Sequence, residues 1–161
     1  MHRASAVKKT MCTALILAAI VAACAYVSAG WFRLMLIRGD SMLPAYHNMQ
    51  IVVLDRHSRE YRRGDVIAFH CEGFKAVLVK RIAACCGDRV QIAEGTLFVN
   101  GEASPLYEKG AFDRAGCLEE EIRPAQGEYV VIGDNTAESR DSRDEAVGTI
   151  RAEEIIGKVI G

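Results

Sequence analysis

The first part of the chain is dominated by one long apolar run. Residues 10–32 contain no charged side chain and consist mainly of Ala, Leu, Ile and Val. As a helix this segment would reach about 34 Å, which is enough to cross a hydrocarbon core of about 30 Å. The pattern predicts a single membrane-spanning anchor over residues 10–32, with the lipid bilayer as a partner.

The residues that flank this run predict its orientation. Arg3, Lys8 and Lys9 precede it, and the excess of positive charge favours a cytoplasmic location for residues 1–9. Residues 33–161 are then expected outside the cytoplasm, as one extracytoplasmic domain of a single-pass protein of the cell membrane. Arg33 and Arg38 follow the run and reduce the asymmetry on which this orientation depends.

A removed secretory signal is the alternative interpretation of the same run. The small residues of Val27-Ser28-Ala29 suit a signal-peptide cleavage site. Apolar character continues through residues 34–37, however, and this favours a retained anchor. Both interpretations place the rest of the chain outside the cytoplasm.

Beyond the run, the hydrophobic pattern changes to short segments rich in Val, Ile and Phe, separated by Gly, Asn and Asp. Such segments are typical of β-strands. We expect strands at 50–54, 65–70, 76–82, 89–92, 96–99, 129–132 and 155–160. Asn100-Gly101 is a hairpin-turn signal, and Glu94-Gly95 predicts another turn. The predicted fold is mostly β, a compact and partly barrel-like set of antiparallel sheets after one N-terminal transmembrane helix.

The segment 102–126 interrupts this pattern and is expected to be a small surface insertion. It contains Pro105, Gly110, Pro124 and the acidic run Glu119-Glu120-Glu121. The chain has 161 residues, 25% of them charged, and a net charge of −1. This balance suits one extracytoplasmic domain and gives no basic surface for nucleic acid.

The cysteines and histidines do not suggest a metal site. Cys12 and Cys24 fall in the apolar run, and the neighbours Cys85 and Cys86 would point to opposite faces of a strand. We therefore expect no metal and no cofactor. Outside the cytoplasm disulfides persist, so one bond between Cys117 or Cys71 and one member of the adjacent pair is a further expectation.

Two residues have the chemistry of a hydrolase. Ser41 follows the anchor by a few residues, but a serine needs an adjacent base before it becomes a good nucleophile. His47, His57 and His70 have no Asp-bearing setting that indicates a catalytic histidine. Lys80 is expected to share its strand face with apolar residues, and desolvation would lower its pKa so that the amine accepts a proton. A serine–lysine dyad is a known variant of the catalytic triad.

A third cluster follows the predicted strand 129–132. It contains Gly133-Asp134-Asn135 and then Ser139, Asp141, Ser142, Arg143 and Gly148. An ordinary acidic surface loop would explain any one of these residues. The density of small, polar and oppositely charged residues indicates a loop held together by hydrogen bonds.

Together these segments resemble the bacterial type I (leader) signal peptidases. Ser41-Met42-Leu43-Pro44 is similar to the nucleophile motif of that family. The motifs around Gly64-Asp65, Lys80-Arg81 and Gly133-Asp134 follow in the same order. The matches extend from Arg38 to Gly148, and the single anchor and small insertion resemble the compact enzymes of Gram-positive bacteria.

The resemblance implies specific roles. Ser41 would be the nucleophile, Lys80 the general base, and Ser139 the residue that orients the Lys80 amine. Asp141 would pair with Arg143, and Asp134 with Arg81. The backbone N–H of Ser41 would belong to the oxyanion hole. The substrates would be exported preproteins, bound as an extended strand and cut after small residues at positions −1 and −3.

Two positions depart from the family pattern. Gly39 stands where some relatives have a serine as a second oxyanion donor, and Ala84-Cys85-Cys86 stands where Gly, an apolar residue and Pro are usual.

Three other functions share some of these features. A peptidase dedicated to pilin or conjugation substrates would have the same motifs. The self-cleaving domain of a stress-response repressor shares the serine–lysine chemistry, but it would need a DNA-binding helix pair, which the sequence lacks. A non-catalytic membrane-anchored assembly factor would be expected to lose Ser41 or Lys80, and both are present. Substrate range and oligomeric state are not predicted.

Overall fold

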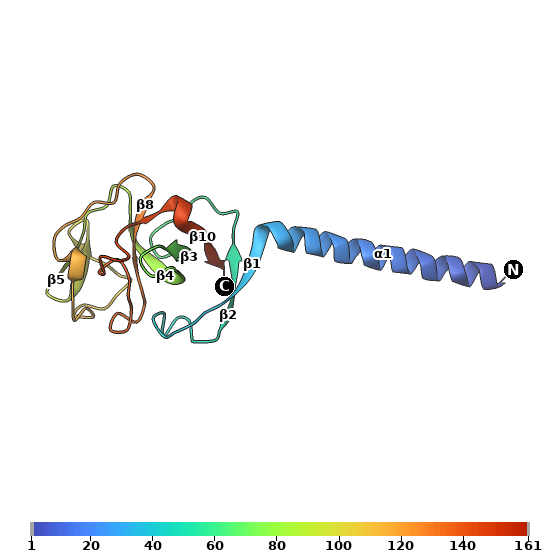
Figure 1. Ribbon diagram of the computed structural model, residues 1–161, viewed down its shortest axis with the longest axis horizontal. Coiled ribbons are helices and arrows are strands. Elements are labelled where there is room, and N and C mark those ends of the chain that lie inside the picture. The colour runs from blue at the N-terminus through green and yellow to red at the C-terminus, as the bar shows by residue number, and fades with distance from the viewer. Residues whose placement is uncertain (1, 161) are drawn as a thin grey trace.

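One long helix precedes a β-sheet domain. The computed structural model describes the backbone of residues 2–160 and the side-chain surroundings of residues 11–26 and 30–160. Helix α1 (His2–Trp31) projects away from the sheets, as Figure 1 shows. The side chains of Lys8, Lys9 and Val27-Ser28-Ala29 lie outside the described residues. A search of the described residues found no helix with the length and apolar character that a membrane crossing requires.

The end of α1 is attached directly to the domain. Strand β1 (Phe32–Leu36) begins at the residue after the helix, so Phe32, the last residue of the predicted anchor, is also the first residue of the sheet. The Trp31 ring stacks on the His57 ring, with centroids 4.5 Å apart, and the backbone N–H of Arg56 donates to Trp31 O at 2.9 Å. The apolar residues after Arg33, which in the sequence favour a retained anchor over a removed signal, form most of this first strand.

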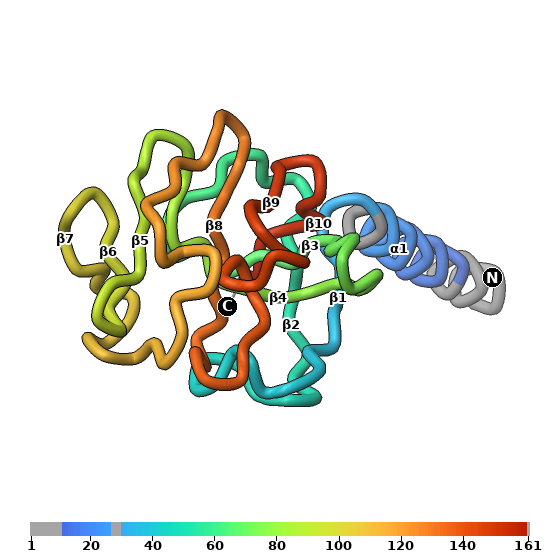
Figure 2. The backbone as a smooth tube through the Cα atoms, turned by 60° about the vertical axis from the view of Figure 1, so that its left-hand side comes forward, coloured from blue at the N-terminus to red at the C-terminus, as the bar shows by residue number. Residues whose placement is uncertain are grey.

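Ten strands form two antiparallel sheets in the described part of the chain. The larger sheet has the order β1-β2-β10-β3-β4-β8-β9, and the smaller has the order β5-β6-β7. The remaining bounds are β2 (Ile51–Asp55), β3 (Val66–Cys71), β4 (Ala76–Cys85), β5 (Val90–Ala93), β6 (Thr96–Val99), β7 (Glu102–Ala103), β8 (Glu128–Ile132), β9 (Ile150–Arg151) and β10 (Ile155–Ile160), with short 3-10 helices η1 (Gly116–Leu118) and η2 (Ala152–Glu154). Figure 2 shows the smaller sheet at the end of the domain opposite α1. The fold is therefore mostly antiparallel β with one N-terminal helix.

Both hairpins of the smaller sheet follow from local turn chemistry. Glu94 and Gly95 have φ of 48° and 69°, and they connect β5 to β6 in the register Ala93↔Thr96. Asn100 and Gly101 have φ of 59° and 84° and connect β6 to β7. Positive φ at both central residues is the requirement of a type I′ turn, whose twist suits an antiparallel pair. The turn signals in the sequence are confirmed.

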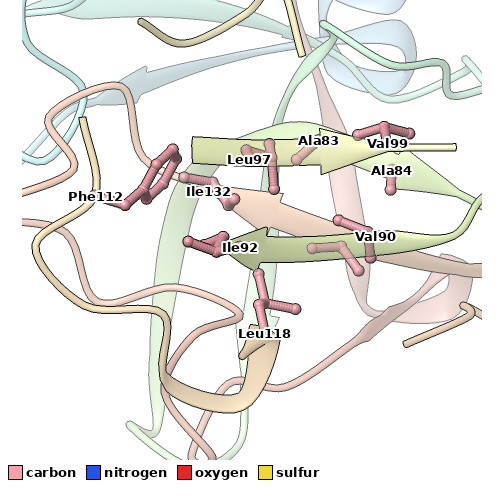
Figure 3. Packing of buried hydrophobic residues seen from close by; sticks show 10 residues of the cluster. Ala83, Ala84, Val90, Ile92, Leu97, Val99, Phe112, Leu118 and Ile132 are labelled. Atoms are coloured by element: carbon pink, nitrogen blue, oxygen red, sulfur yellow. The ribbon is translucent and has the colours of Figure 1, made fainter. Parts of the chain in front are cut away.

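The segment 102–126 takes part in the core. Phe112 and Leu118 are buried and pack in a cluster with Ile92, Leu97 and Ile132 (Figure 3). This cluster joins the smaller sheet to the end of β8, so a segment that the sequence presents as a surface insertion supplies part of the contact between the two sheets.

The expected disulfide is wrong for this structure, because all six cysteines are free thiols. Cys71 directs its sulfur toward Ala146 O, and Cys85 directs its sulfur toward Tyr61 O. Cys117 lies in η1, beside the smaller sheet. Tertiary packing gives these thiols different neighbours, which the spacing along the chain does not reveal.

Candidate active site

Ser41 lies in the loop between β1 and β2, where the neighbouring Met42 anchors the chain. The Met42 side chain is 1% exposed and packs with Ile37 and Val79. The backbone N–H of Tyr46 donates to Met42 O at 2.9 Å, which closes a turn after Ser41. The serine is therefore held on a buried support while its own side chain stays half-buried.

A second segment holds the Ser41 backbone from the other side. The backbone N–H of Asn135 donates to Ser41 O at 3.0 Å, and the Asn135 side-chain amide donates to Asp40 O at 3.1 Å. Gly133 lies so close that a Cβ there would be 2.5 Å from Ser41 O and 2.2 Å from Ser139 Oγ. A residue with a side chain at position 133 would therefore collide with both serines.

Lys80 reaches Ser41 from β4. Its Nζ lies 2.6 Å from Ser41 Oγ, within hydrogen-bond distance, although the two residues are far apart in sequence. Residues of β4 alternate between two faces, and the face of Lys80 also carries the buried Ile82. Lys80 itself is only 3% exposed.

Burial controls the electrostatics of this amine. Desolvation is the largest influence and lowers the pKa of Lys80 to about 8, from an ordinary value of 10.5. The carboxylates of Asp141 and Asp134 act against this shift, and the Arg143 guanidinium acts with it. A substantial share of the amine is therefore neutral near physiological pH and can accept a proton from Ser41.

The two carboxylates near Lys80 are each engaged by an arginine. Asp134 accepts from Arg81 Nε at 2.7 Å and from Arg81 Nη2 at 2.6 Å, and this contact is the main reason that the pKa of Arg81 is raised. Asp141 accepts from Arg143 Nε at 2.8 Å and from Arg143 Nη2 at 2.9 Å, with both side chains almost completely buried. Because an arginine neutralises each carboxylate, neither Asp134 nor Asp141 stabilises the charged form of Lys80 strongly.

The Asp141–Arg143 pair also organises the backbone of its own loop. Asp141 Oδ2 accepts from Gly133 N–H at 3.1 Å, and Arg143 Nη2 donates to Thr136 O at 2.8 Å and to Ser139 O at 3.2 Å. Because Gly133 and Asn135 support Ser41, this ion pair acts on the serine through the backbone. Neither Gly133 nor Asn135 was singled out individually in the sequence, where the two residues indicate only a loop held together by hydrogen bonds.

Ser139, the residue expected to orient the Lys80 amine, lies beside Gly133. Its side chain is completely buried, and its hydroxyl has no hydrogen-bond partner among the described residues. The hydroxyl faces Gly133, on the side of Gly133 that also faces Ser41 O, and it makes no hydrogen bond to Lys80. The one hydrogen bond that the Lys80 amine makes within the described chain goes to Ser41.

Two backbone donors near the nucleophile differ in their partners. The Ser41 N–H makes no hydrogen bond within the described residues, whereas Gly39 N–H donates to Asn48 Oδ1 at 3.0 Å. Gly39 thus offers no side-chain donor, and its backbone donor is in use. In the same described part, no group of three His, Cys, Asp or Glu side chains is arranged to hold a metal ion.

A cavity of about 450 Å³ adjoins the two reactive groups. It lies between β1 and β4 and is lined by Met35, Leu36, Ile37, Arg38, Ser41, Met42, Ala76, Val77, Leu78, Val79 and Lys80. We call this space, together with its walls, the cleft. A serine hydroxyl in contact with a desolvated amine at one end of a cleft is the arrangement of a serine–lysine hydrolase.

Comparison with known proteins agrees with this class. The sequence matches the family described as signal peptidase, peptidase S26, over residues 8–160, so the chain belongs to that family. Signal peptidase I T of Bacillus subtilis (strain 168) is 31% identical over 137 residues, covering 78% of this chain and 70% of the relative. Signal peptidase I of Bacillus licheniformis is 28% identical over 155 residues, covering 89% of this chain and 82% of the relative.

A solved structure supports the fold. The crystal structure of a signal peptidase I from Enterococcus faecalis V583 has a TM-score of 0.51 with 24% sequence identity, and the match covers 63% of this chain and 97% of that one. The resemblance to the signal peptidase I family, and to its forms from Bacillus, is confirmed. The activity of the chain is that of a signal peptidase I, a serine endopeptidase.

Proposed function

We propose that Ser41 and Lys80 are the nucleophile and general base with which this peptidase removes signal peptides from exported preproteins. The observation that carries the proposal is the 2.6 Å contact between Lys80 Nζ and Ser41 Oγ, together with the lowered pKa of the amine. Neutral Lys80 takes the hydroxyl proton while Ser41 Oγ attacks the scissile carbonyl. The Ser41 N–H, which is free of other partners in the described chain, donates to the oxyanion.

The remaining steps return the proton. The Lys80 ammonium protonates the amine of the leaving chain, which departs as the mature protein and leaves an acyl group on Ser41. Lys80, neutral again, activates a water molecule that hydrolyses this ester. Asp141 with Arg143, and Asp134 with Arg81, are positioning residues that hold the two segments in place. Ser139 is proposed as a further positioning residue for the amine, because its buried hydroxyl is free to turn toward a partner.

The substrate is proposed to bind as an extended strand along β4. Ile82 N–H donates toward β3, to Asp65 O at 2.8 Å. The N–H and C=O groups of successive residues point to opposite edges of a strand, so those of Arg81, Val79 and Val77 point away from β3. Strand β8 pairs with β4 from Arg81 onward, which leaves the part of this edge before Arg81 without a partner strand in the described chain.

Strand addition at this edge explains the expected preference for small residues. Main-chain hydrogen bonds to Val77 and Val79 would supply affinity, and alternate side chains of the substrate would enter the cleft. The −1 side chain would meet Ile37 and Met42, and the −3 side chain would meet Met35, all of which line the cleft. These bulky side chains leave shallow space at both positions.

Residues 10–32 are proposed as a membrane anchor, with residues 1–9 in the cytoplasm and the catalytic domain 33–161 outside. The support comes from the uncharged sequence and from the exposure of α1, where Met11, Leu17 and Tyr26 are 60, 66 and 81% exposed. Such a row of apolar side chains needs an apolar environment. The direct connection from Trp31 to β1 would hold the cleft near the bilayer, where the apolar segment of a preprotein arrives. N-terminal sequencing that began at Gly30 would refute the anchor.

The experiment incubates detergent-solubilised protein with a preprotein and compares wild type, Ser41→Ala and Lys80→Ala. We expect each variant to lose all but a few per cent of cleavage while its thermal unfolding remains cooperative. The double variant should lose about as much as either single one, because the two groups act as a unit. Ser58→Ala and Lys109→Ala, which line none of the cleft, are the matched controls. Cleavage above a few per cent in Ser41→Ala or Lys80→Ala would contradict the dyad.

A further inference from the structure

The cleft continues into a second cavity on the side away from Ser41. This cavity has a volume of about 280 Å³, and we call it the outer pocket. Its walls include Arg33, Met35, Leu54, His70, Val77 and Ile156. Met35, Leu36 and Val77 also line the cleft, so the two cavities share a boundary.

Most residues of the outer pocket belong to one face of the larger sheet, and Leu34 and Leu36, which alternate with Arg33 and Met35 along β1, also line it. Arg33 pairs with Leu54, and His70 pairs with Val77, and paired residues of antiparallel strands point to the same side. Leu54 packs with Met35, Ile156 and Val79 in one cluster. Five neighbouring strands, β1, β2, β10, β3 and β4, thus contribute to the wall of this pocket.

The side chains of β1 on that face form a series. Ile37 lines only the cleft, Met35 lines both cavities, and Arg33 lines only the outer pocket. These residues are two apart, so successive members are separated by about 6.6 Å along the strand. An extended substrate has the same period, and its side chains at −1, −3 and −5 also point to one face.

The direction of the substrate follows from the position of the helix. Arg33 is two residues after the end of α1, so the outer pocket lies at the end of the cleft nearer the proposed anchor. The apolar segment of a preprotein precedes its cleavage site and arrives from the same side. Residues upstream of −3 therefore extend from the cleft toward the outer pocket.

We propose that the outer pocket is a third specificity subsite, which receives the side chain at position −5 of the preprotein. This inference rests on the proposed binding mode and adds a position to it. Leu54, Ile156, Met35 and Val77 favour an apolar side chain at −5. The positive charge of Arg33 at the wall of the pocket disfavours Lys or Arg there.

The test uses the full chain in detergent and a series of preproteins that differ only at −5, with Ala, Leu or Lys. We expect kcat/KM to be about 3- to 20-fold higher for Leu than for Ala, within the range that a few methylene groups contribute in an apolar pocket. Lys should give a lower value than Ala. The same three residues at −4, which point to the opposite face, should have no such effect.

Two enzyme variants connect the preference to the pocket. Ile156→Phe should reduce the advantage of Leu at −5, because the larger ring fills the cavity, while cleavage of the Ala substrate is retained. Arg33→Glu should reverse the charge preference, so that Lys at −5 becomes better than Ala. Because Arg33 is exposed, Arg33→Glu is expected to leave the folding of the domain unchanged. Arg89→Glu, an exposed charge reversal outside both cavities, is the matched control and should leave the preference unchanged.

Equal rates across the −5 series would overturn the third subsite, and so would equal effects at −4 and −5. A preference for Leu that survived both Ile156→Phe and Arg33→Glu would also overturn it. None of these results would affect the dyad, whose test is the loss of cleavage of the Ala substrate in Ser41→Ala.

Discussion

The pH dependence of cleavage tests how burial of Lys80 produces a base. The pKa of the amine falls from 10.5 to about 8, chiefly through desolvation. This shift corresponds to roughly 3 kcal/mol between the two protonation states. At pH 7 about a tenth of the amine is then neutral, compared with on the order of 3 in 10,000 for an exposed lysine. Desolvation therefore makes the active form about 300-fold more abundant.

The assay is kcat/KM for preprotein cleavage between pH 5.5 and 10.5, which reports the pKa of groups in the free enzyme. We expect a tenfold rise per pH unit below about pH 7 and a plateau above about pH 9, with a midpoint near 8. An acidic limb that is absent, or one that has its midpoint near pH 10, would refute the reasoning.

The same shift has a consequence for stability that needs no substrate. The folded-state pKa of Lys80 is lower than the unfolded value, so the unfolded chain binds more protons between pH 8 and 10.5. Burial of the amine therefore costs stability below pH 8, and the cost disappears as the pH rises through this window. Relative to Lys80→Met, which has no amine to titrate, the wild type should gain up to roughly 3 kcal/mol of unfolding free energy from pH 8 to 10.5. A pH-independent difference would mean that the amine is solvated.

Three further variants or treatments follow from the geometry of the site. Ser139→Ala should lower kcat about 10- to 1000-fold. Its stability should be unchanged or increased, because the lost hydroxyl is buried without a partner in the described chain. Full activity of this variant would assign Ser139 no role in positioning the amine. Gly133→Ala should abolish cleavage and lower the unfolding temperature, since its Cβ would be 2.2 Å from Ser139 Oγ; circular dichroism melting and the cleavage assay check both effects. Treatment with a chelator should leave activity unchanged, and loss of activity that added zinc restored would contradict a metal-free mechanism.

The amino-acid sequence by itself determined the elements that depend on local interactions. The two hairpins at Glu94-Gly95 and Asn100-Gly101 are signalled by Gly95, Asn100 and Gly101, because Gly and Asn tolerate the positive φ that these turns require. Most strands were also predictable, because apolar β-branched residues between turn signals have few other stable arrangements. The order of motifs around Ser41, Lys80 and Gly133 was sufficient to indicate the family, which the comparisons confirm.

Tertiary structure decided how these elements meet. The apolar residues after Arg33 supported a retained anchor in the sequence, and pairing with β2 makes them a strand. The free thiols and the burial of Phe112 and Leu118 depend on neighbours that are distant in sequence. The Ser139 hydroxyl, which has no hydrogen-bond partner in the described chain, depends on how its loop folds back on Gly133. The same is true of the depth at which Lys80 is buried and of the two connected cavities beside it. Desolvation and cavity shape are produced by packing among several strands at once, so no single segment of sequence contains them.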